Sequence, residues 1–302
     1  MSHYSRFTSP EHRSHVVLVW LVVTLLTSSA AILTRYCRMP ATSIGFWRVL
    51  GGALVLSPWW YAAWKREGRP AVFSFGTCLT GLFLGVHFAT WAWALQHTTI
   101  ANAMLFIGLQ PLLAPFVARP LLGERLTRWE MTACALACLG MFWILGRQFA
   151  YGGEHLAGSL VAFGSAFLCG CYFVLSRKYR AGQHALLFSV PVYLTAAGVQ
   201  LAAGVLVDGG ISVGDGSTRL AVLGLILLPT VGGHTLAIYL LRHVKSQMVS
   251  LTVPAQFIFS TTAAVFLFGE TPSYWFLSGA VVVMSGVVLG VTKSERVPVP
   301  RR

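Results

Sequence analysis

Long intervals without a charged residue recur along the whole chain, and they constrain the fold more than any other feature. No Asp, Glu, Lys or Arg occurs in residues 14–34, 70–118, 155–176, 220–241, 246–269 and 271–292. A hydrocarbon core about 30 Å thick needs roughly 20 apolar residues for each helix that crosses it. The interval 70–118 is long enough for two crossings. We therefore expect an integral membrane protein that crosses the bilayer many times.

The composition agrees with this expectation and defines the kind of span. Hydrophobic residues make up 56% of the 302-residue chain and charged residues only 10%, against about 25% in soluble domains. Membrane β-barrels show short alternating segments, whereas these runs are continuous. The sequence predicts an all-α integral membrane fold with ten transmembrane helices, at residues 15–35, 43–64, 73–95, 99–118, 128–146, 157–176, 184–206, 219–241, 247–268 and 273–292.

The distribution of basic residues predicts the orientation of these helices. With both termini on one side, that side holds 17 of the Lys and Arg residues and the other side holds 4, while Arg48 falls within a span. Cytoplasmic loops carry such an excess of positive charge. The net charge of +13 would suggest nucleic acid for a soluble protein, but here it follows from topology. We expect cytoplasmic termini and no nucleic-acid partner.

The chain also contains an internal repeat. A shift of 146 residues superimposes scarce residues on one another: Leu95 on Leu241, His97 on His243, Gln110 on Gln256, Gly123-Glu124 on Gly269-Glu270, Trp129 on Trp275, and Gly140 on Gly286. A one-residue gap also brings His87 onto His234. Each half then holds five spans, an odd number, so the second half enters the membrane from the opposite side. Inverted repeats of this kind are common in secondary transporters.

Several segments resemble the EamA-like domain of the drug/metabolite transporter superfamily. They are IGLQPLLAPFVARPLLGERL from Ile107, its partner ending AVFLFGETPSYWFLSGAVVVMSGVVLG, and ATSIGFWRVLGGALVLSPWW around Arg48. GVHFATWAWALQHT and PTVGGHTLAIYLL resemble a subgroup with a histidine in the third and eighth helices. The resemblance implies a carrier of the cell inner membrane. One departure is that Phe257 stands opposite Pro111, so the two halves need not bend alike.

This resemblance and the predicted spans together divide the chain. We expect a cytoplasmic tail at residues 1–14, a first EamA-like repeat at 15–147 and a connecting loop at 148–156. A second EamA-like repeat follows at 157–293, and a cytoplasmic tail at 294–302 ends the chain.

Arg48 is the only Lys or Arg well within a predicted span. A charge inside the membrane is expensive and is a functional candidate by default. An arginine in a cavity can hold a carboxylate or phosphate with two hydrogen bonds. The alternative is that Arg48 lies about one turn from the outer end and reaches the interface with its long side chain.

The histidines and aromatic residues of the third and eighth spans are further candidates. His87 and His234 are related by the repeat, and a histidine can exchange a proton near neutral pH. They can equally be polar residues that hold helices together. Trp91 shares a helix face with His87, and Trp93 matches Tyr239 in the repeat. We include these aromatic residues among the expected substrate contacts, although packing is the alternative.

Amides and helix breakers complete the candidate site. Gln110 and Gln256 occupy matching places in the repeat, Asn102 adds another amide, and Thr252, Gln256 and Ser260 form a polar stripe. Such groups either line a wet cavity or join helices. Interruptions are expected at Pro111 and Pro115, and at Pro229, Gly232 and Gly233 before His234, where free backbone groups can face a cavity. The alternative is that these residues only kink the helices for packing. Glu124 and Glu270 are expected to be structural, as caps of the next helix, with a role in ion coupling as the alternative.

The main hypothesis is a secondary transporter that exports a small polar metabolite, such as an amino acid. A multidrug efflux carrier would prefer an aromatic cavity with a buried acid, and no acidic residue lies mid-span. A membrane enzyme would need clustered His and carboxylates, and a scaffold protein is a third alternative. The sequence predicts no enzyme activity, cofactor or metal site, and it predicts a small-molecule substrate and the lipid bilayer as partners. Oligomeric state is not predicted.

Overall fold

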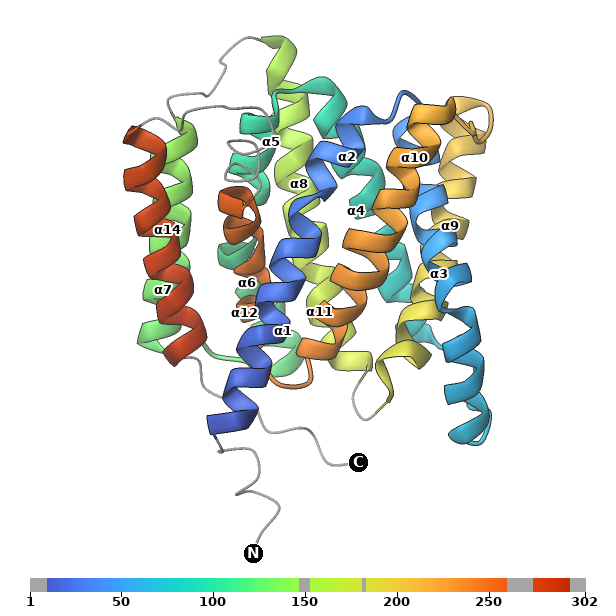
Figure 1. Ribbon diagram of the computed structural model, residues 1–302, viewed down its shortest axis with the longest axis horizontal. Coiled ribbons are helices and arrows are strands. Elements are labelled where there is room, and N and C mark those ends of the chain that lie inside the picture. Colours follow the sequence, from blue (N-terminus) through green and yellow to red (C-terminus); the bar gives the residue numbers. More distant parts are fainter. Residues whose placement is uncertain (1–9, 147–152, 181–182, 260–273, 294–302) are drawn as a thin grey trace, which may run out of the picture.

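The computed structural model describes residues 10–146, 153–180, 183–259 and 274–293, which form a bundle of helices (Figure 1). The described residues contain no strand. Seven segments are long and apolar enough to cross a membrane: Ser14–Tyr36, Phe75–His97, Asn102–Leu122, His155–Tyr179, Ala185–Asp208, Gly216–Leu240 and Tyr274–Lys293. The chain is therefore a helical, multi-pass membrane protein.

The helices follow one another along the chain with short connections. The first half contains α1 (Pro10–Ser28), α2 (Ala30–Tyr36), α3 (Ala41–Arg66), α4 (Phe75–His97), α5 (Ile100–Ile107), α6 (Gln110–Leu122) and α7 (Arg128–Leu145). The second half contains α8 (Gly153–Tyr179), α9 (Ala185–Asp208), α10 (Gly216–Leu225), the π-helix η3 (Ile226–His234), α11 (Thr235–Leu240), α12 (Ser246–Ser250) and α14 (Tyr274–Lys293). Residues 252–259 are helical as well.

Helical segments overlap all ten predicted spans, but several are interrupted. The span predicted at 15–35 is broken between α1 and α2, 99–118 between α5 and α6, and 219–241 at η3. The predicted span 247–268 extends beyond the described residues. Helices α3 and α7 are not among the seven apolar segments. The number of ten transmembrane helices therefore stays a prediction.

The two halves enter the bundle from opposite ends. Helix α1 begins and α14 ends at the same end (Figure 1). There His15 Nε2 lies 3.3 Å from the Tyr239 hydroxyl, and Lys293 Nζ lies 5.9 Å from the Trp129 ring centroid. At the other end, where α7 ends and α14 begins, Trp143 Nε1 donates to Ser278 Oγ at 3.0 Å. This is the arrangement of an inverted repeat.

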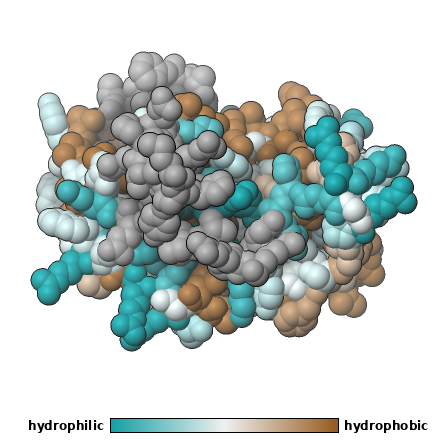
Figure 2. All heavy atoms as spheres, turned by 90° about the horizontal axis from the view of Figure 1, so that it is seen from below, coloured by the Kyte–Doolittle hydropathy of each residue, from teal (hydrophilic) through white to brown (hydrophobic). Residues whose placement is uncertain are grey.

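We call the end that holds Arg125, Arg177, Arg180, Lys245 and Lys293 the basic end, and the other the opposite end. Seen from the basic end, hydrophilic side chains gather on the described part of the face, with hydrophobic ones among them and at its rim (Figure 2). Arg180 lies at this end beyond the last turn of α8, and burial lowers the pKa of its guanidinium to about 10. It therefore remains charged at neutral pH.

The pairing of α7 with α14 shows the repeat in three dimensions. Both helices lie side by side at the edge of the bundle (Figure 1). A Cβ added at Gly140 would lie 2.7 Å from the backbone N of Val283, and one at Gly286 would lie 2.7 Å from that of Ala137. These four positions form two pairs related by the 146-residue shift. The two helices approach each other through the same small residues on both sides of the contact.

Two arginines bind matching backbone carbonyls, one at each end of the bundle. Arg35 donates to the carbonyl of Leu95 near the end of α4, and Arg177 donates to the carbonyl of Leu241 just after α11. Leu95 and Leu241 are matched by the repeat. Each arginine satisfies a carbonyl that has no partner inside its own helix.

Candidate functional site

A cavity of about 70 Å³ lies in the interior of the bundle, between helices of both halves. Most of the side chains in its wall are aliphatic or aromatic. The residues that line it are Val23, Thr27, Ser28, Ala30, Ala31, Arg48, His87, Phe88, Trp91, Met104, Ile107, Gln110, Cys169, Phe173, Pro229, His234, Ala237, Thr252, Val253 and Gln256. Six of the nine substrate contacts expected from the sequence are among them.

Arg48 lies on the wall of this cavity and is only 3% exposed. Its Nε donates to Thr230 Oγ1 at 2.7 Å, and its Cζ lies 3.9 Å from the centroid of the Phe88 ring. Its Nη2 is buried and has no hydrogen-bond partner among the described residues. Arg48 is the eighth residue of α3, and its burial beside Thr230 favours the cavity position over a long side chain that ends in the headgroup region.

The partner of Arg48 is created by a break in the eighth predicted span. Pro229 has no N–H, so the carbonyl of Leu225, four residues earlier, loses its usual helical donor. The hydroxyl of Thr230 donates to this carbonyl instead, at 2.8 Å, and the backbone continues as the π-helix η3. The same Thr230 oxygen then accepts from Arg48. The proline thus places the acceptor that orients the guanidinium, at a helical irregularity of the kind found at functional sites.

A hydroxyl on α9 fixes this irregular turn. Tyr193 is fully buried, and its hydroxyl donates to the carbonyl of Thr230 at 3.2 Å and lies 3.0 Å from Thr235 Oγ1. The carbonyl of Thr230 therefore has a partner although the surrounding turn is not α-helical. This contact holds η3 in place behind Arg48.

His87 is held by a reciprocal pair of hydrogen bonds with α8. Its Nδ1 lies 2.8 Å from Ser165 Oγ and 3.0 Å from the Ser165 carbonyl, while Ser165 Oγ donates to the His87 carbonyl at 3.1 Å. A carbonyl only accepts, and the serine hydroxyl has already used its proton, so Nδ1 must carry the hydrogen. In the neutral ring Nε2 is then an acceptor.

His234, its repeat partner, has a different environment. It is surrounded by rings: Phe88 lies edge-on at 5.1 Å between centroids, Tyr172 at 5.7 Å and Phe173 at 6.3 Å. Its Nδ1 is buried without a hydrogen-bond partner among the described residues. Phe88 thus contacts His234 on one side and the Arg48 guanidinium on another, and this aromatic ring joins the two halves at the cavity.

The two glutamines also lie at the cavity. Gln110 Nε2 donates to Ser250 Oγ at 3.2 Å, whereas its Oε1 is buried without a partner in the described part of the chain. Gln256 Nε2 lies 3.4 Å from Thr252 Oγ1, as expected for the polar stripe, whose third member Ser260 is outside the described residues. The break near Gln110 lies at Gly108 and Leu109, before Pro111 and not at it. Pro111 occupies the first turn of α6, where its missing N–H costs nothing.

Three residues expected at the site lie elsewhere. Trp93 stacks on His97 with 3.8 Å between ring centroids, and it lines a separate groove of about 540 Å³ near the opposite end. Asn102 Nδ2 donates to Ser159 Oγ at 3.2 Å and so joins α5 to α8. Tyr239 lies at the basic end, next to His15 and His243. None of the three contributes to the wall of the central cavity.

Several residues that shape the site were not among the candidates expected from the sequence. Thr230, Ser165 and Tyr193 position Arg48, His87 and η3, but single hydroxyl residues in apolar spans are too frequent to stand out. Phe88 follows His87 directly and is one of 19 phenylalanines. The one usable signal was Pro229, because a proline within a span frees the carbonyl four residues before it.

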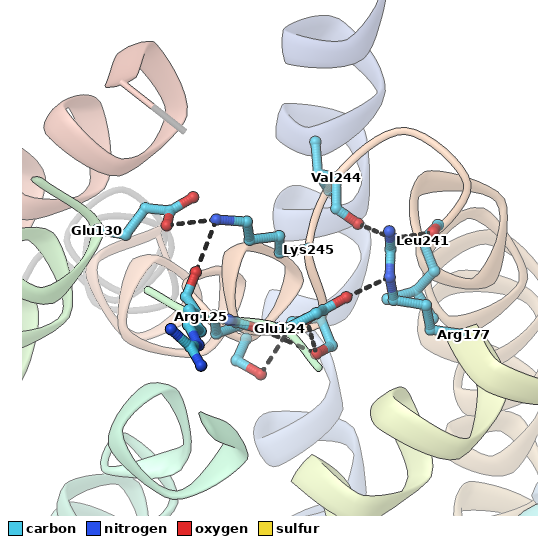
Figure 3. Close-up of polar contacts among 10 residues, drawn as sticks. Glu124, Arg125, Glu130, Arg177, Leu241, Val244 and Lys245 are labelled. Atoms are coloured by element: carbon cyan, nitrogen blue, oxygen red, sulfur yellow. Dashed lines mark hydrogen bonds and ion pairs between the residues drawn. The ribbon is translucent and has the colours of Figure 1, made fainter. Parts of the chain in front are cut away.

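Charged side chains of the two halves contact each other at the basic end (Figure 3). Glu124, just after α6, forms an ion pair with Arg177 at the end of α8, and Glu130 pairs with Lys245 at 2.7 Å. Arg177 also donates to the carbonyls of Leu241 and Val244. Each ion pair joins a carboxylate of the first half to a cation of the second. We call Glu124, Glu130, Arg177 and Lys245 the ionic cluster.

Further hydrogen bonds join the ionic cluster to the backbone. Lys245 Nζ donates to the Arg125 carbonyl at 3.0 Å, and Ser246 Oγ donates to Glu124 Oε2 at 3.2 Å. The expectation that Glu124 caps the next helix is wrong. Glu130 forms that cap instead, in a reciprocal pair with Thr127, because Thr127 precedes α7 directly. Glu270 lies outside the described residues.

Comparison with known proteins identifies the family. The model of the EamA-like transporter family matches residues 15–146 and again 156–292. An uncharacterized transporter of Archaeoglobus fulgidus is 24% identical over 265 residues, which cover 88% of this chain and 92% of that protein. An uncharacterized transporter of Pseudomonas aeruginosa is 32% identical over 117 residues, 36% of this chain and 39% of that one.

A solved crystal structure has the same fold. Its TM-score is 0.76 at 23% identity, and the superposition covers 93% of this chain and 98% of the other. At this level of identity the likeness concerns the fold alone.

Proposed function

The chain belongs to the EamA-like transporter family, and on that premise we propose that it is a secondary transporter that exports a small polar metabolite, such as an amino acid. In this proposal ten helices cross the cell inner membrane with both termini in the cytoplasm. The basic end is then the cytoplasmic end, in line with the positive-inside rule.

The observation that carries the proposal is the position of the cavity between the two halves. Arg48, His87 and Gln110 come from the first half, and His234 and Gln256 from the second. Inverted repeats place substrate sites at such an interface, near the midplane and beside interrupted helices. We propose Arg48, His87, Trp91, Gln110, His234 and Gln256 as the substrate contacts. Trp93, Asn102 and Tyr239 then act in helix packing.

In the proposed transport cycle, the ionic cluster holds the two halves together at the basic end. Transport requires that the cavity open first to one end of the bundle and then to the other. Glu124 and Arg177 connect the two halves at the basic end, so opening toward that end must separate them. Because the side chains of Glu124 and Arg177 are only 3% and 9% exposed, they must gain water or other partners as the two halves move apart at this end.

No observation favours the multidrug alternative. The described residues that line the cavity include no Asp or Glu, and a carrier that exchanges protons for drug cations needs a buried carboxylate. The cavity is also far smaller than the roughly 300–1,000 Å³ of drug-sized sites.

The test is transport by the purified protein in liposomes. Pooled labelled metabolites, including amino acids, hydroxy acids, sugars and nucleosides, are loaded inside or outside, with and without a proton or sodium gradient. We expect gradient-dependent movement of at least one small polar compound. A chain that is folded and correctly inserted but moves none of them would contradict the proposal and favour a scaffold.

A further inference from the structure

We propose that the central cavity recognises a small monocarboxylate that also carries a hydrogen-bond donor, with the carboxylate at Arg48 and the donor at Gln110 and His87. This inference rests on the proposed function and specifies its substrate class. It is argued from the groups that the cavity leaves unsatisfied.

The first such group is the guanidinium of Arg48. Among the described residues that line the cavity, Arg48 is the only one with a formally charged side chain of the Asp, Glu, Lys or Arg type. Thr230 and Phe88 each contact it, but neither carries a formal charge, and Nη2 has no hydrogen-bond partner in the described part of the chain. A buried cation without a counter-charge is strongly unfavourable. An anion in the cavity would supply both the missing charge and the missing acceptor.

The number of charges selects the class of anion. One guanidinium balances one negative charge, and with both histidines neutral the described wall of the cavity carries no other formal charge. A phosphate monoester carries about −1.5 to −2 at neutral pH, which would leave a negative excess in a dry wall. A carboxylate carries one charge, and its two oxygens match the two-point geometry of a guanidinium. The cavity therefore favours a monocarboxylate over phosphate.

Acceptors on the same wall select the second group of the ligand. Gln110 Oε1 is buried without a partner among the described residues, and its amide nitrogen is already engaged with Ser250. His87 presents Nε2 as an acceptor because its Nδ1–H is bound to Ser165. Two acceptors require a donor such as an ammonium or a hydroxyl. A hydroxy acid provides the carboxylate and the donor in one molecule with a single net negative charge, which balances Arg48. An amino acid also provides both groups, but its ammonium leaves one positive charge in the cavity and therefore has to lie against the two acceptors and away from Arg48.

The size of the cavity limits the ligand in this conformation. One water-sized group needs about 10–15 Å³ of such a volume, so about 70 Å³ holds on the order of five to seven non-hydrogen atoms. Alanine, serine and lactate are of this size. The apolar side of the wall, with Met104, Ile107 and Phe173, can contact a short aliphatic chain.

The experiment compares matched ligands on the full-length protein in liposomes. Labelled alanine and lactate are the probes, and unlabelled alanine, lactate, alaninamide and inorganic phosphate are the competitors. Alaninamide keeps the donor and the size of alanine but lacks the carboxylate. We expect competition by alanine and lactate, and competition weaker by at least about tenfold for alaninamide and phosphate, since a hydrogen bond to a charged group contributes about a factor of ten or more.

Substitutions of Arg48 test whether this residue is the source of the selectivity for carboxylates. Arg48→Gln should weaken apparent affinity for the carboxylate probe by about 10- to 100-fold, and Arg48→Lys by less, because the charge remains while the two-point contact is lost. Arg219→Gln, an exposed arginine at the opposite end, is the control and should leave affinity unchanged. Gln110→Met should weaken alanine competition through loss of the Oε1 acceptor.

Two outcomes separate this inference from the proposed function. Transport of an uncharged or cationic metabolite that Arg48→Gln leaves unchanged would overturn the carboxylate site while transport stands. Equal competition by phosphate and lactate would also overturn it. Failure to transport any metabolite would instead contradict the proposed function. Monodisperse elution of each variant from a sizing column shows that its chain is folded.

Discussion

Glu124 and Arg177 form an ion pair that joins the two halves of the chain at the basic end. Glu124 is buried and Arg177 is largely buried. Each has a further partner, Ser246 for the carboxylate and the carbonyls of Leu241 and Val244 for the guanidinium. Removal of one member of a buried pair leaves the other charge uncompensated and costs about 3–5 kcal/mol. The pair therefore favours the conformation in which the basic end is closed.

Glu124→Gln is predicted to open the basic end more often. The variant removes the counter-charge of Arg177 but keeps the size of the side chain. Cys169 lines the cavity and is 5% exposed, so it is a native reporter once the other cysteines are replaced. Its labelling by a thiol reagent that cannot cross membranes, applied from the basic end, should accelerate by about tenfold, equivalent to about 1.4 kcal/mol. Glu67→Gln, exposed at the end of α3, is the matched control, and equal acceleration in both variants would disprove the role of the ion pair.

Gly233→Ala is predicted to impair both stability and transport. A Cβ at this position would lie 2.3 Å from Cγ2 of Thr27, so α1 and η3 must separate beside the cavity. Overpacking of this kind costs about 1–3 kcal/mol. Thermal unfolding in detergent and transport in liposomes measure the two effects. Gly164→Ala in α8, where no atom lies within 4 Å of an added Cβ, should be neutral or slightly stabilising; similar losses at both positions would argue against the close contact.

Replacement of His87 or His234 by Ala is predicted to reduce transport severalfold without loss of expression. His87→Ala removes the Nε2 acceptor from the cavity, and His234→Ala removes an imidazole packed against Phe88. Ser165→Ala is the informative companion, because His87 keeps its bond to the Ser165 carbonyl and should retain most of its function. Initial transport rates provide the measurement. Normal rates in the double histidine variant would mean that both residues only join helices.

Single cysteines are predicted to report opposite sides of the membrane at the two ends of the bundle. Glu67→Cys lies just after α3 at the basic end, and Ser217→Cys lies in the first turn of α10 at the opposite end; both positions are exposed. The excess of Lys and Arg at the basic end predicts that a membrane-impermeant maleimide labels Ser217→Cys in intact cells and Glu67→Cys only after cell disruption. The reverse result would contradict cytoplasmic termini, and labelling of both from one side would contradict the inverted repeat.

The sequence predicted those site residues whose polar side chains are rare in apolar spans. Arg48, His87, His234, Gln110 and Gln256 are polar residues in apolar spans, and the structure brings all five to one cavity. Thr230 and Ser165 escaped notice because their hydroxyls are common in such spans and their partners are distant in sequence. The helical character of the chain followed from its charge-free intervals, whereas the break before Pro111 depends on local backbone geometry that the hydrophobic pattern does not encode.

Repeat symmetry was informative for some pairs and misleading for others, for a geometric reason. The symmetry of an inverted repeat exchanges the two ends of the bundle. Residues near the middle of their helices, such as His87 and His234, therefore stay close to each other. Trp93 and Tyr239 lie toward helix ends, so the same symmetry separates them: Trp93 stacks on His97 at the opposite end, and Tyr239 contacts the tilted ring of His243 at the basic end. A repeat match predicts proximity only near the symmetry axis.

The hydrogen bond between Arg48 and Thr230 has a consequence for how the protein is made. The two residues are 182 positions apart, and a ribosome adds about 5–20 residues per second, so Arg48 leaves the ribosome roughly 10–40 seconds before its acceptor exists. During that interval the guanidinium of α3 has no Thr230 to receive its proton, and lipid does not supply an acceptor. The nascent α3 must then wait beside the insertion machinery or in contact with water. We expect a chain that stops after α9 to be degraded, and the first half to depend on the second for its place in the bilayer.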